Sequence, residues 1–319
     1  MDTLNEILTQ QTRRAFLERG TLGLGTMALG SLLDAAPAPS RRNAVGGLKG
    51  LPHFAPKVKR VIYLFQSGGP AQMDLFDYKP HLASRHGEEV PESIYPAERK
   101  TTMTAGQKSF PCAPSTLKFA RHGQAGTWVS EPQKHVAKLV DDICVIKSMH
   151  TEAINHDPAA TLFQTGSVIP GRPSMGSWVS YGLGTHNANL PSFMVISPGL
   201  PYAGEQVWGS DFLPVMHQGT RIIPGDEPIA NMHRRAATAN QQRDELGLLE
   251  FFNRQHLKGR ESDPHLRARI KSFETAYGMQ AEAPEAFDLT RETDATHRLY
   301  GLKRGDTEGF GWQCMVARR

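Results

Sequence analysis

The chain has 319 residues, of which 39% are hydrophobic and 21% charged, as is typical of a soluble globular protein that can bury a full core. The net charge of +4 is spread along the chain, which gives no sign of a nucleic-acid-binding tract. The three cysteines, Cys112, Cys144 and Cys314, have neither CxxC nor zinc-knuckle spacing, which excludes a disulfide framework and a zinc finger. Cys144 lies in an apolar run, and we predict it to be a core residue.

The N-terminus has the pattern of an export signal. Arg13 and Arg14 form a twin-arginine pair, followed by the uncharged segment Gly20–Leu33 and the small-x-small sequence Ala36-Pro37-Ala38. This pattern predicts a Tat signal peptide over residues 1–38. The apolar segment is shorter than the roughly 20 residues that cross a bilayer, so we expect no stable membrane span.

Export by this route predicts the Tat translocase as a transient partner and a final location in the periplasm or outside the cell. Residues 39–56 are rich in glycine and proline, and we predict a linker there. The folded domain is then expected over residues 57–319.

The first predicted element of that domain is a buried strand over Val61–Phe65. This apolar run is too short and too rich in β-branched and aromatic residues to favour a helix. A turn with two glycines, Ser67-Gly68-Gly69-Pro70, follows it, and then come Asp74 and Asp77. In open α/β sheets, functional residues lie just after the carboxyl ends of the strands. A strand followed by a glycine turn and an acidic residue is typical of such a site. The alternative is a tight turn whose aspartates only cap the next element.

The segment 81–138 contains five prolines and no sustained period, which predicts long loops with short helices. A short amphipathic helix is predicted over His135–Val140. Ile143–Ile146 predicts a second buried strand, which runs into the polar loop 147–158.

A helix is predicted to begin at this polar loop. Pro158 suits a first helical position, Asn155 or Asp157 suits the cap, and Gly166 stops the helix after about Gln164. A third strand is predicted over Phe193–Ile196.

The second half of the chain predicts helices with charged outer faces. Apolar residues recur at helical spacing over Asn240–His256, Pro264–Tyr277 and Pro284–Leu299, and a final helix opens near Thr307 and still runs at Arg319. That ending, without a cap or a polar tail, leads us to expect a truncated reading frame. Trp178 and Tyr181 are predicted core residues, and four histidines are predicted to be structural or exposed: His217, His233, His256 and His265.

Four motifs carry a resemblance to a known family. The twin-arginine leader and residues 60–80, 155–184 and 300–319 occur in the order typical of the DUF1501 family, which this chain resembles. Its members are exported bacterial proteins placed with sulfatases in the alkaline-phosphatase-like superfamily, and they continue past the point where this chain ends. The resemblance implies an α/β/α sandwich around a mostly parallel sheet, here incomplete and with a helical C-terminal excursion. It also implies a metal site at the strand ends and, from the superfamily, hydrolysis of sulfate or phosphate esters.

One position departs from the sulfatase pattern. In sulfatases the nucleophile is a modified cysteine nine residues before the threonine of a Thr-Gly motif, and counting back from Thr165 gives His156. We predict His156 as the catalytic residue: its imidazole can ligate a metal, act as a general base or attack directly. The alternative is a histidine that only caps and packs at a helix start.

The positions of polar residues after the predicted strands indicate a ligand set and a substrate-binding set. If the first two strands are neighbours, their carboxyl ends bring Asp74 and His156 to the same edge. A divalent metal ion, with Zn²⁺, Mn²⁺ or Ca²⁺ as options, would be bound by Asp74, Asp77, His150 and His156. The anionic ester would be bound by Ser67, Gly68, Gly69, Asn155 and Arg172, the arginine by a bidentate contact. Each of these residues alone can equally be an ordinary surface residue.

Two functions from different classes follow. The first is an exported metal-dependent hydrolase of sulfate or phosphate esters, expected to be inactive in this truncated form. The second is a non-catalytic exported binding or scaffold protein that keeps the fold without the usual nucleophile.

Overall fold

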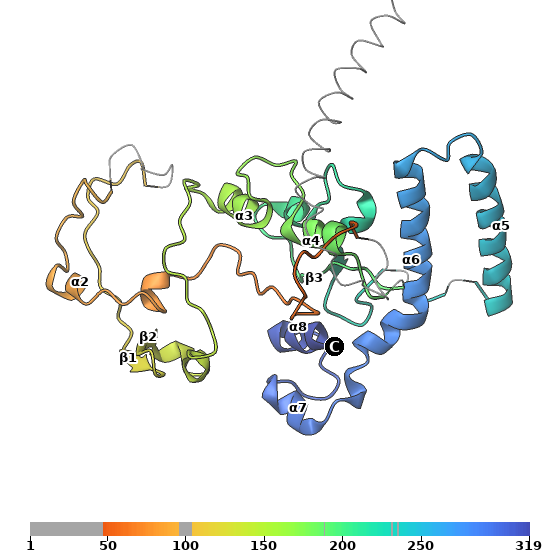
Figure 1. The fold of residues 1–319 in the computed structure, drawn as a ribbon. Helices are drawn as coiled ribbons and strands as arrows, with labels where there is room; N and C mark the ends of the chain where they lie inside the picture. Colours follow the sequence, from red (N-terminus) through yellow and green to blue (C-terminus); the bar gives the residue numbers. More distant parts are fainter. Residues whose placement is uncertain (1–46, 96–103, 188, 231, 235) are drawn as a thin grey trace, which may run out of the picture.

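The computed structural model describes residues 47–95, 104–187, 189–230, 232–234 and 236–319. The predicted Tat signal, including Arg13 and Arg14, lies outside the described residues. The architecture is mixed α/β with 39% helix and a few short strands (Figure 1). The α-helices and strands are α2 (His81–Ser84), β1 (Phe119–His122), β2 (Thr127–Ser130), α3 (His156–Thr165), α4 (Met175–Leu183), β3 (Met194–Ile196), β4 (Thr220–Ile222), α5 (Ala239–Leu257), α6 (Pro264–Phe287), α7 (Asp294–Leu299) and α8 (Gly309–Arg318).

The strands form two small sheets. β1 and β2 make an antiparallel hairpin in which Phe119 pairs with Ser130, and β3 and β4 pair in parallel with Met194 opposite Thr220. The predicted third strand is thus confirmed, and its partner β4 was not predicted. No large parallel sheet is present among the described residues.

The other two predicted strands are wrong. Val61–Phe65 and Ile143–Ile146 are irregular, and most of their side chains are exposed, Val61 by 75%. Neither segment pairs with a strand in the described part of the chain, and an apolar run without a partner strand has no ladder to join. Cys144, predicted to be in the core, is exposed for the same reason.

Among the described residues, most of the buried apolar side chains form three clusters. The largest joins β4 to the C-terminal helices through Ile222, Leu289, Trp312, Met315 and Val316. A second joins α3 to the short 3-10 helix η5 (Gly204–Trp208), and a third supports the β1–β2 hairpin. Two further short elements matter below: the 3-10 helices η1 (Gln72–Asp74) and η6 (Val215–His217).

The helices agree better with the predictions from the sequence than the strands do. α3 ends at Gly166 and α5 lies within one residue of its predicted bounds at either end. α8 begins at Gly309, close to the predicted start. His135–Val140 contains one turn of 3-10 helix, Val136–Leu139.

The predicted break before Pro284 is wrong, because α6 continues through this proline to Phe287. A proline inside a helix lacks the backbone N–H and bends the axis, and Figure 1 shows α6 changing direction over its last turns. The separate helix predicted after it is reduced to α7.

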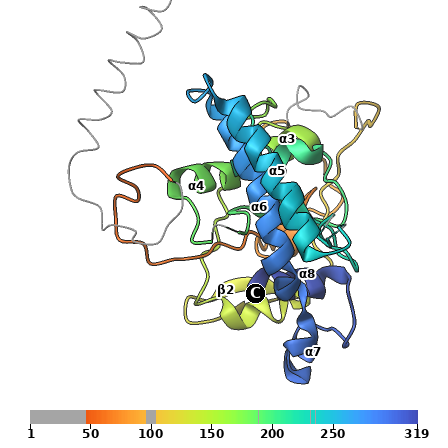
Figure 2. The ribbon, with the colours of Figure 1, turned by 90° about the vertical axis from the view of Figure 1, so that its right-hand side faces the viewer.

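α5 and α6 form an antiparallel pair at one edge of the molecule, with α5 outermost (Figures 1 and 2). Trp178 on α4 is 45% exposed rather than buried, and Tyr181 is half-buried. None of the helices in the described ranges combines the length and the apolar character that crossing a bilayer requires.

Candidate functional site

The N-terminus of α3 carries the predicted catalytic residue. His156 is the first helical residue, and Asn155 is the N-cap, with extended backbone and no capping hydrogen bond from its side chain. The carbonyl of Asn155 accepts from the backbone N–H of Ala159, 3.1 Å away. Both side chains are exposed. The first-turn N–H groups and the helix dipole favour an anion at such an end.

The ring of His156 is held by Tyr202. The two rings stack with centroids 4.8 Å apart and an interplanar angle of 18°. The stack fixes the plane of the imidazole, and the His156 residue remains exposed to solvent. Nothing in the local sequence around Tyr202 pointed to this contact.

The glycine turn lies against the same pair of rings. A Cβ built on Gly68 would lie 3.5 Å from Cε2 of Tyr202 and 3.6 Å from Cε1 and Nδ1 of His156. Gly68 and Gly69 have φ of +85° and +68°, a conformation that favours glycine, and the Gly69 N–H donates to the carbonyl of Gln66. The structure therefore brings together two parts of the predicted site, the glycine turn and His156.

Aromatic packing explains why the turn reaches this helix. Phe163 of α3 stacks with Tyr63 and Phe65, with centroid distances of 6.2 and 6.1 Å. Phe65 also packs on the buried cluster that α3 shares with η5. Burial raises the pKa of the Tyr63 phenol, which a hydrogen bond with Gln164 partly offsets. The segment before the turn is thus bound along α3 by its side chains rather than by strand pairing.

Asp74 and Asp77 have different neighbours. Phe76, between them, packs on the cluster of the β1–β2 hairpin, and the Ser130 N–H donates to the carbonyl of Leu75 at 3.0 Å. Asp77 forms an ion pair with Lys79 at 3.0 Å. Within the described ranges, no hydrogen bond or ion pair joins either carboxylate to His156. The shared strand edge on which we expected the acid and the histidine to meet is not formed, because neither strand is.

The remaining predicted residues lie on the surface. His150, Arg172 and Ser67 are exposed. In the part of the chain that the structure describes, no three side chains of the His, Cys, Asp or Glu type are grouped so that they could hold a metal ion. The predicted ligands therefore do not form a complete binding site for a divalent metal ion among the described residues. The metal assignment stays a prediction.

The comparison with protein families decides the family. The model described as "Protein of unknown function (DUF1501)" matches residues 58–319. The chain belongs to this family. No curated protein and no solved structure matches it. DUF1501 is an uncharacterised family, so membership by itself assigns no activity.

A second polar cluster in this DUF1501 chain was missed from the sequence. The Ser180 hydroxyl of α4 lies 2.8 Å from Nδ1 of His217 and also hydrogen-bonds the Ser192 hydroxyl. The ring of Tyr181 meets that of His217 edge-on at 5.3 Å. Burial lowers the pKa of His217. His217 thus has the structural role predicted for it, linking η6 to α4, and the helical i, i+3 spacing of the buried Ser177 and Ser180 was a usable signal for this face.

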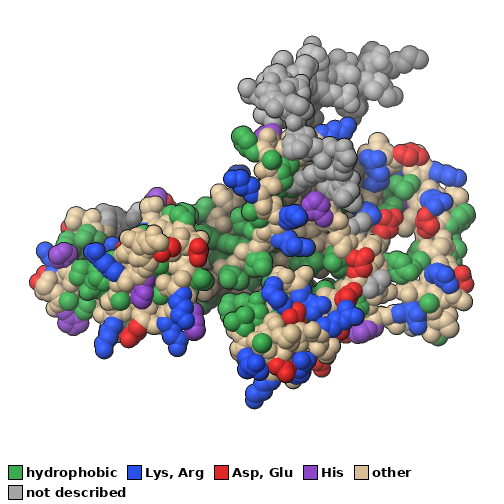
Figure 3. All heavy atoms as spheres, turned by 60° about the horizontal axis from the view of Figure 1, so that its bottom comes forward, with side chains coloured by type: hydrophobic (Ala, Val, Ile, Leu, Met, Phe, Trp, Pro, Cys, Tyr) green, Lys and Arg blue, Asp and Glu red, His purple; other side chains and the backbone are tan. Residues whose placement is uncertain are grey.

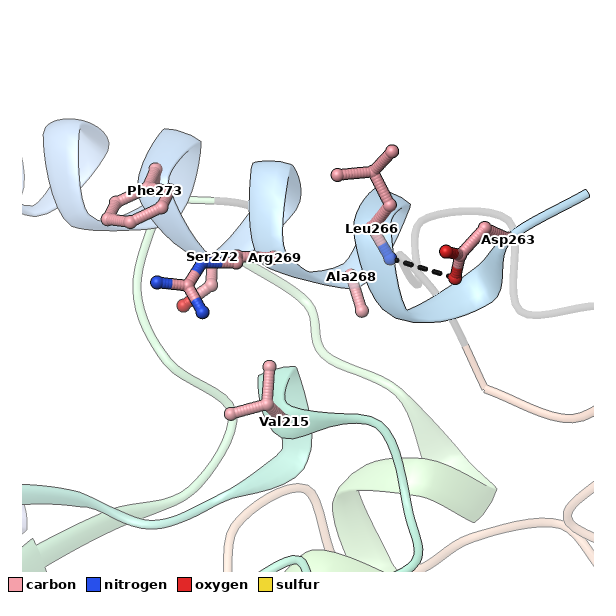
Figure 4. Close-up of a pocket in the computed structure, with 7 residues that line it drawn as sticks. All are labelled: Val215, Asp263, Leu266, Ala268, Arg269, Ser272 and Phe273. Atoms are coloured by element: carbon pink, nitrogen blue, oxygen red, sulfur yellow. Dashed lines mark hydrogen bonds between the residues drawn. The ribbon is translucent and has the colours of Figure 1, made fainter. Parts of the chain in front are cut away.

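A cavity of about 510 Å³ lies between the first half of α6 and η6. Figure 4 shows its lining residues, Val215, Asp263, Leu266, Ala268, Arg269, Ser272 and Phe273. The Asp263 carboxylate accepts from the backbone N–H of Leu266 at 3.2 Å, at the start of α6. The Arg269 guanidinium lies 5.8 Å from the centre of the Phe273 ring. No residue of the predicted site lines this cavity.

Proposed function

We propose that this DUF1501 chain is an exported sulfatase-like protein that binds the anionic group of a sulfate or phosphate ester at the N-terminus of α3. The observation that carries the proposal is the packing of the Gly68 turn against the stacked rings of His156 and Tyr202. Backbone without a Cβ beside a helix N-terminus is a common setting for a tetrahedral anion. Asn155 contributes an exposed amide that makes no capping bond.

His156 supplies the chemistry in this proposal. A neutral imidazole beside a bound ester accepts a proton from an attacking water, or attacks the ester itself. The exposure of His156 and its fixed ring plane suit either role. Ser67 and Gly69 lie on the same turn, and Arg172 is assigned to the bound anion from the exposed loop before α4.

The wider parts of the proposal rest on the family pattern. The α/β/α sandwich is supported by the parallel pairing of β3 with β4. Delivery beyond the cytoplasmic membrane is supported by the twin-arginine sequence. A divalent metal would supply charge neutralisation of the ester, with His156 as one ligand. No step above depends on it.

The alternative function is a non-catalytic exported binding or scaffold protein. The observation that favours it is the imidazole of His156 at the position where sulfatases carry a modified cysteine. A binding protein needs the anion site of α3 but no nucleophile.

Paired binding and turnover measurements separate the two. Inorganic sulfate and phosphate are titrated calorimetrically, and p-nitrophenyl sulfate and phosphate are assayed with and without Zn²⁺, Mn²⁺ and Ca²⁺. His156→Ala is compared with His53→Ala, since His53 is also exposed but lies far along the sequence, in the predicted linker. Turnover lost only in His156→Ala supports the hydrolase. Anion binding without turnover agrees with the binding protein and also with a hydrolase that is inactive in this form, and an anion affinity that His156→Ala leaves unchanged then favours the binding protein. Neither binding nor turnover by the unmodified chain would refute both.

A further inference from the structure

The cavity between α6 and η6, which we call the α6–η6 cavity, contains an arginine whose charge is not paired within the fold. The Arg269 guanidinium lies 5.8 Å from the centre of the Phe273 ring, a distance at which an aromatic face attracts a cation. Within the described ranges, this guanidinium has no hydrogen bond and no ion pair. Phe273 therefore holds the arginine at the cavity while its N–H donors remain open to a ligand.

The α6–η6 cavity also has an apolar lining. Val215, Leu266, Ala268 and Phe273 contribute to it. Ala268 is buried, whereas Val215 and Phe273 are 48% and 63% exposed, so the cavity opens to solvent. Its volume of about 510 Å³ lies within the roughly 300–1,000 Å³ of small-molecule sites. It is therefore large enough for a small organic molecule with an apolar body.

Ser272 adds a hydroxyl beside Arg269. The two residues are three positions apart on α6, so their side chains lie on the same face of the helix. Figure 4 shows both on the side of α6 that faces Val215. In the part of the chain that the structure describes, the Ser272 hydroxyl makes no hydrogen bond. A guanidinium and a hydroxyl donor together match the oxygens of one carboxylate.

Asp263 limits how much negative charge the cavity accepts. Its carboxylate lines the cavity at the start of α6, where it accepts the Leu266 N–H at 3.2 Å. Arg269 lies six residues further along the helix, which is about 9 Å at about 1.5 Å per residue. A carboxylate bound at Arg269 is therefore compatible with Asp263. A second acid group at the far end of the ligand would be repelled by it.

The other charges near the cavity do not line it. Among the described side chains, this holds for the charged residues that are close to the lining residues in the sequence: Asp211, Arg260, Glu261, Arg267, Lys271 and Glu274. On η6, the His217 ring pairs with the Ser180 hydroxyl of α4 instead. Figure 3 shows basic and acidic side chains interspersed over the visible face of the α5–α6 pair, at the right of the view. A ligand with a single negative charge fits these surroundings better than a polyanion.

We propose that the α6–η6 cavity binds a small aromatic monocarboxylate. The carboxylate contacts the Arg269 guanidinium and the Ser272 hydroxyl. The ring packs on Phe273, with Val215 opposite. A ring is favoured over an alkyl chain because aromatic pairs gain an offset-stacked or edge-to-face contact beyond the area that they bury. The cavity shares no residue with the anion site of α3, so binding here does not depend on the function proposed above.

Calorimetric titration with naphthoate, an aromatic monocarboxylate, tests the proposal and should show one saturable site. Arg269→Gln should weaken binding at least about tenfold, because charge-assisted hydrogen bonds are lost, and Phe273→Ala about three- to tenfold. Arg267→Gln is the matched control and should leave the affinity unchanged, because Arg267 is an exposed arginine of the same helix outside the cavity. Circular dichroism checks that each variant keeps its helix content. Absence of saturable binding overturns the proposal, and so does an equal loss in Arg267→Gln.

Competing probes test the chemical class of the ligand. Naphthol keeps the ring without the carboxylate, and inorganic phosphate is an anion without a ring. Each should displace naphthoate only at concentrations at least about tenfold higher. Equal competition by naphthol would mean an apolar cavity without a carboxylate site, and equal competition by phosphate a general anion site; either result overturns the proposal. His156→Ala should leave naphthoate binding unchanged, and a loss in that variant would place the probe at α3 instead.

Discussion

The imidazole ring of His156 lies nearly parallel to the phenol ring of Tyr202, with their centroids 4.8 Å apart. This pairing ties the start of α3 to a loop 46 positions later in the chain and fixes the ring that we propose contacts the ester. Tyr202 itself is 68% exposed, so the stack is its main contribution to the fold.

The first prediction follows from this stack. Tyr202→Ala should weaken binding of phosphate or sulfate about three- to tenfold, because aromatic pairs contribute about 0.5–1.5 kcal/mol to holding a ring in place. Tyr202→Phe keeps the ring and should bind as the unmodified chain does. Calorimetric titration measures both, and equal weakening by the two substitutions would mean that the hydroxyl, not the stack, matters.

The second prediction compares two neighbouring glycines. Gly68→Val and Gly69→Val both place a side chain at positive φ, and each should lower the free energy of unfolding by about 1–3 kcal/mol. A Cβ at position 68 meets the His156 and Tyr202 rings, whereas one at position 69 meets nothing within 4 Å. Anion binding should therefore fall in Gly68→Val only. The same loss in Gly69→Val, measured well below its melting temperature, would mean that the rings are not the cause.

Sequence signals that act within a few residues were more reliable than signals that depend on a distant partner segment. A helix start near Pro158, capped by Asn155 or Asp157, and a stop at Gly166 could be predicted because cap, proline and glycine act within a few residues; α3 begins at His156 with Asn155 as its cap. The irregular conformation of Val61–Phe65 could not be predicted, because whether an apolar run becomes a strand depends on whether another strand pairs with it. In this structure the run is bound along α3 through Tyr63, Phe65 and Phe163.

The candidate site shows the same difference between local signals in the sequence and contacts that join distant segments. Gly68 and His156 belong to separate motifs, and the structure brings them together. Asp74 was expected beside them only through a sheet edge that does not form, and its neighbour Phe76 packs on the hairpin cluster. The contacts of Tyr202 and of the Ser180–His217 pair join distant segments, and the i, i+3 spacing of the buried Ser177 and Ser180 is the one local signal for either of them.

The third prediction concerns pH. Burial lowers the pKa of His217 in the folded chain, while the unfolded chain has the ordinary value of about 6.5. Below about pH 6.5 the unfolded state therefore binds more protons, and stability falls as the pH drops through that value. The fall in melting temperature from about pH 8 to pH 5 should be smaller in His217→Gln than in the unmodified chain. His86→Gln, at an exposed histidine, serves as the control and should leave the slope unchanged.

The fourth prediction concerns the largest core cluster. Met315 is 0% exposed and packs with Trp312 against Ile222 of β4. Met315→Ala should lower the free energy of unfolding by about 2–5 kcal/mol, through lost apolar burial and a cavity. Leu299→Ala, at a residue 81% exposed, should change it by less than about 0.5 kcal/mol. Urea unfolding measures both, and similar midpoints for the two variants would contradict the assignment of α8 to the core.

The last prediction concerns metal binding. Ions such as Zn²⁺ are held tightly by three or four protein ligands, and the described residues contain no group of three suitable side chains. We therefore expect calorimetric titration of this chain with Zn²⁺ or Mn²⁺ to show only weak binding, with dissociation constants above about 10⁻⁴ M. Weak binding through a single imidazole should decrease in His156→Ala and in His150→Ala to similar small extents, because both histidines are exposed. Tight binding that His156→Ala weakens tenfold while His150→Ala does not would contradict this expectation. It would show that His156 belongs to a complete metal site and would move the metal into the hydrolytic mechanism.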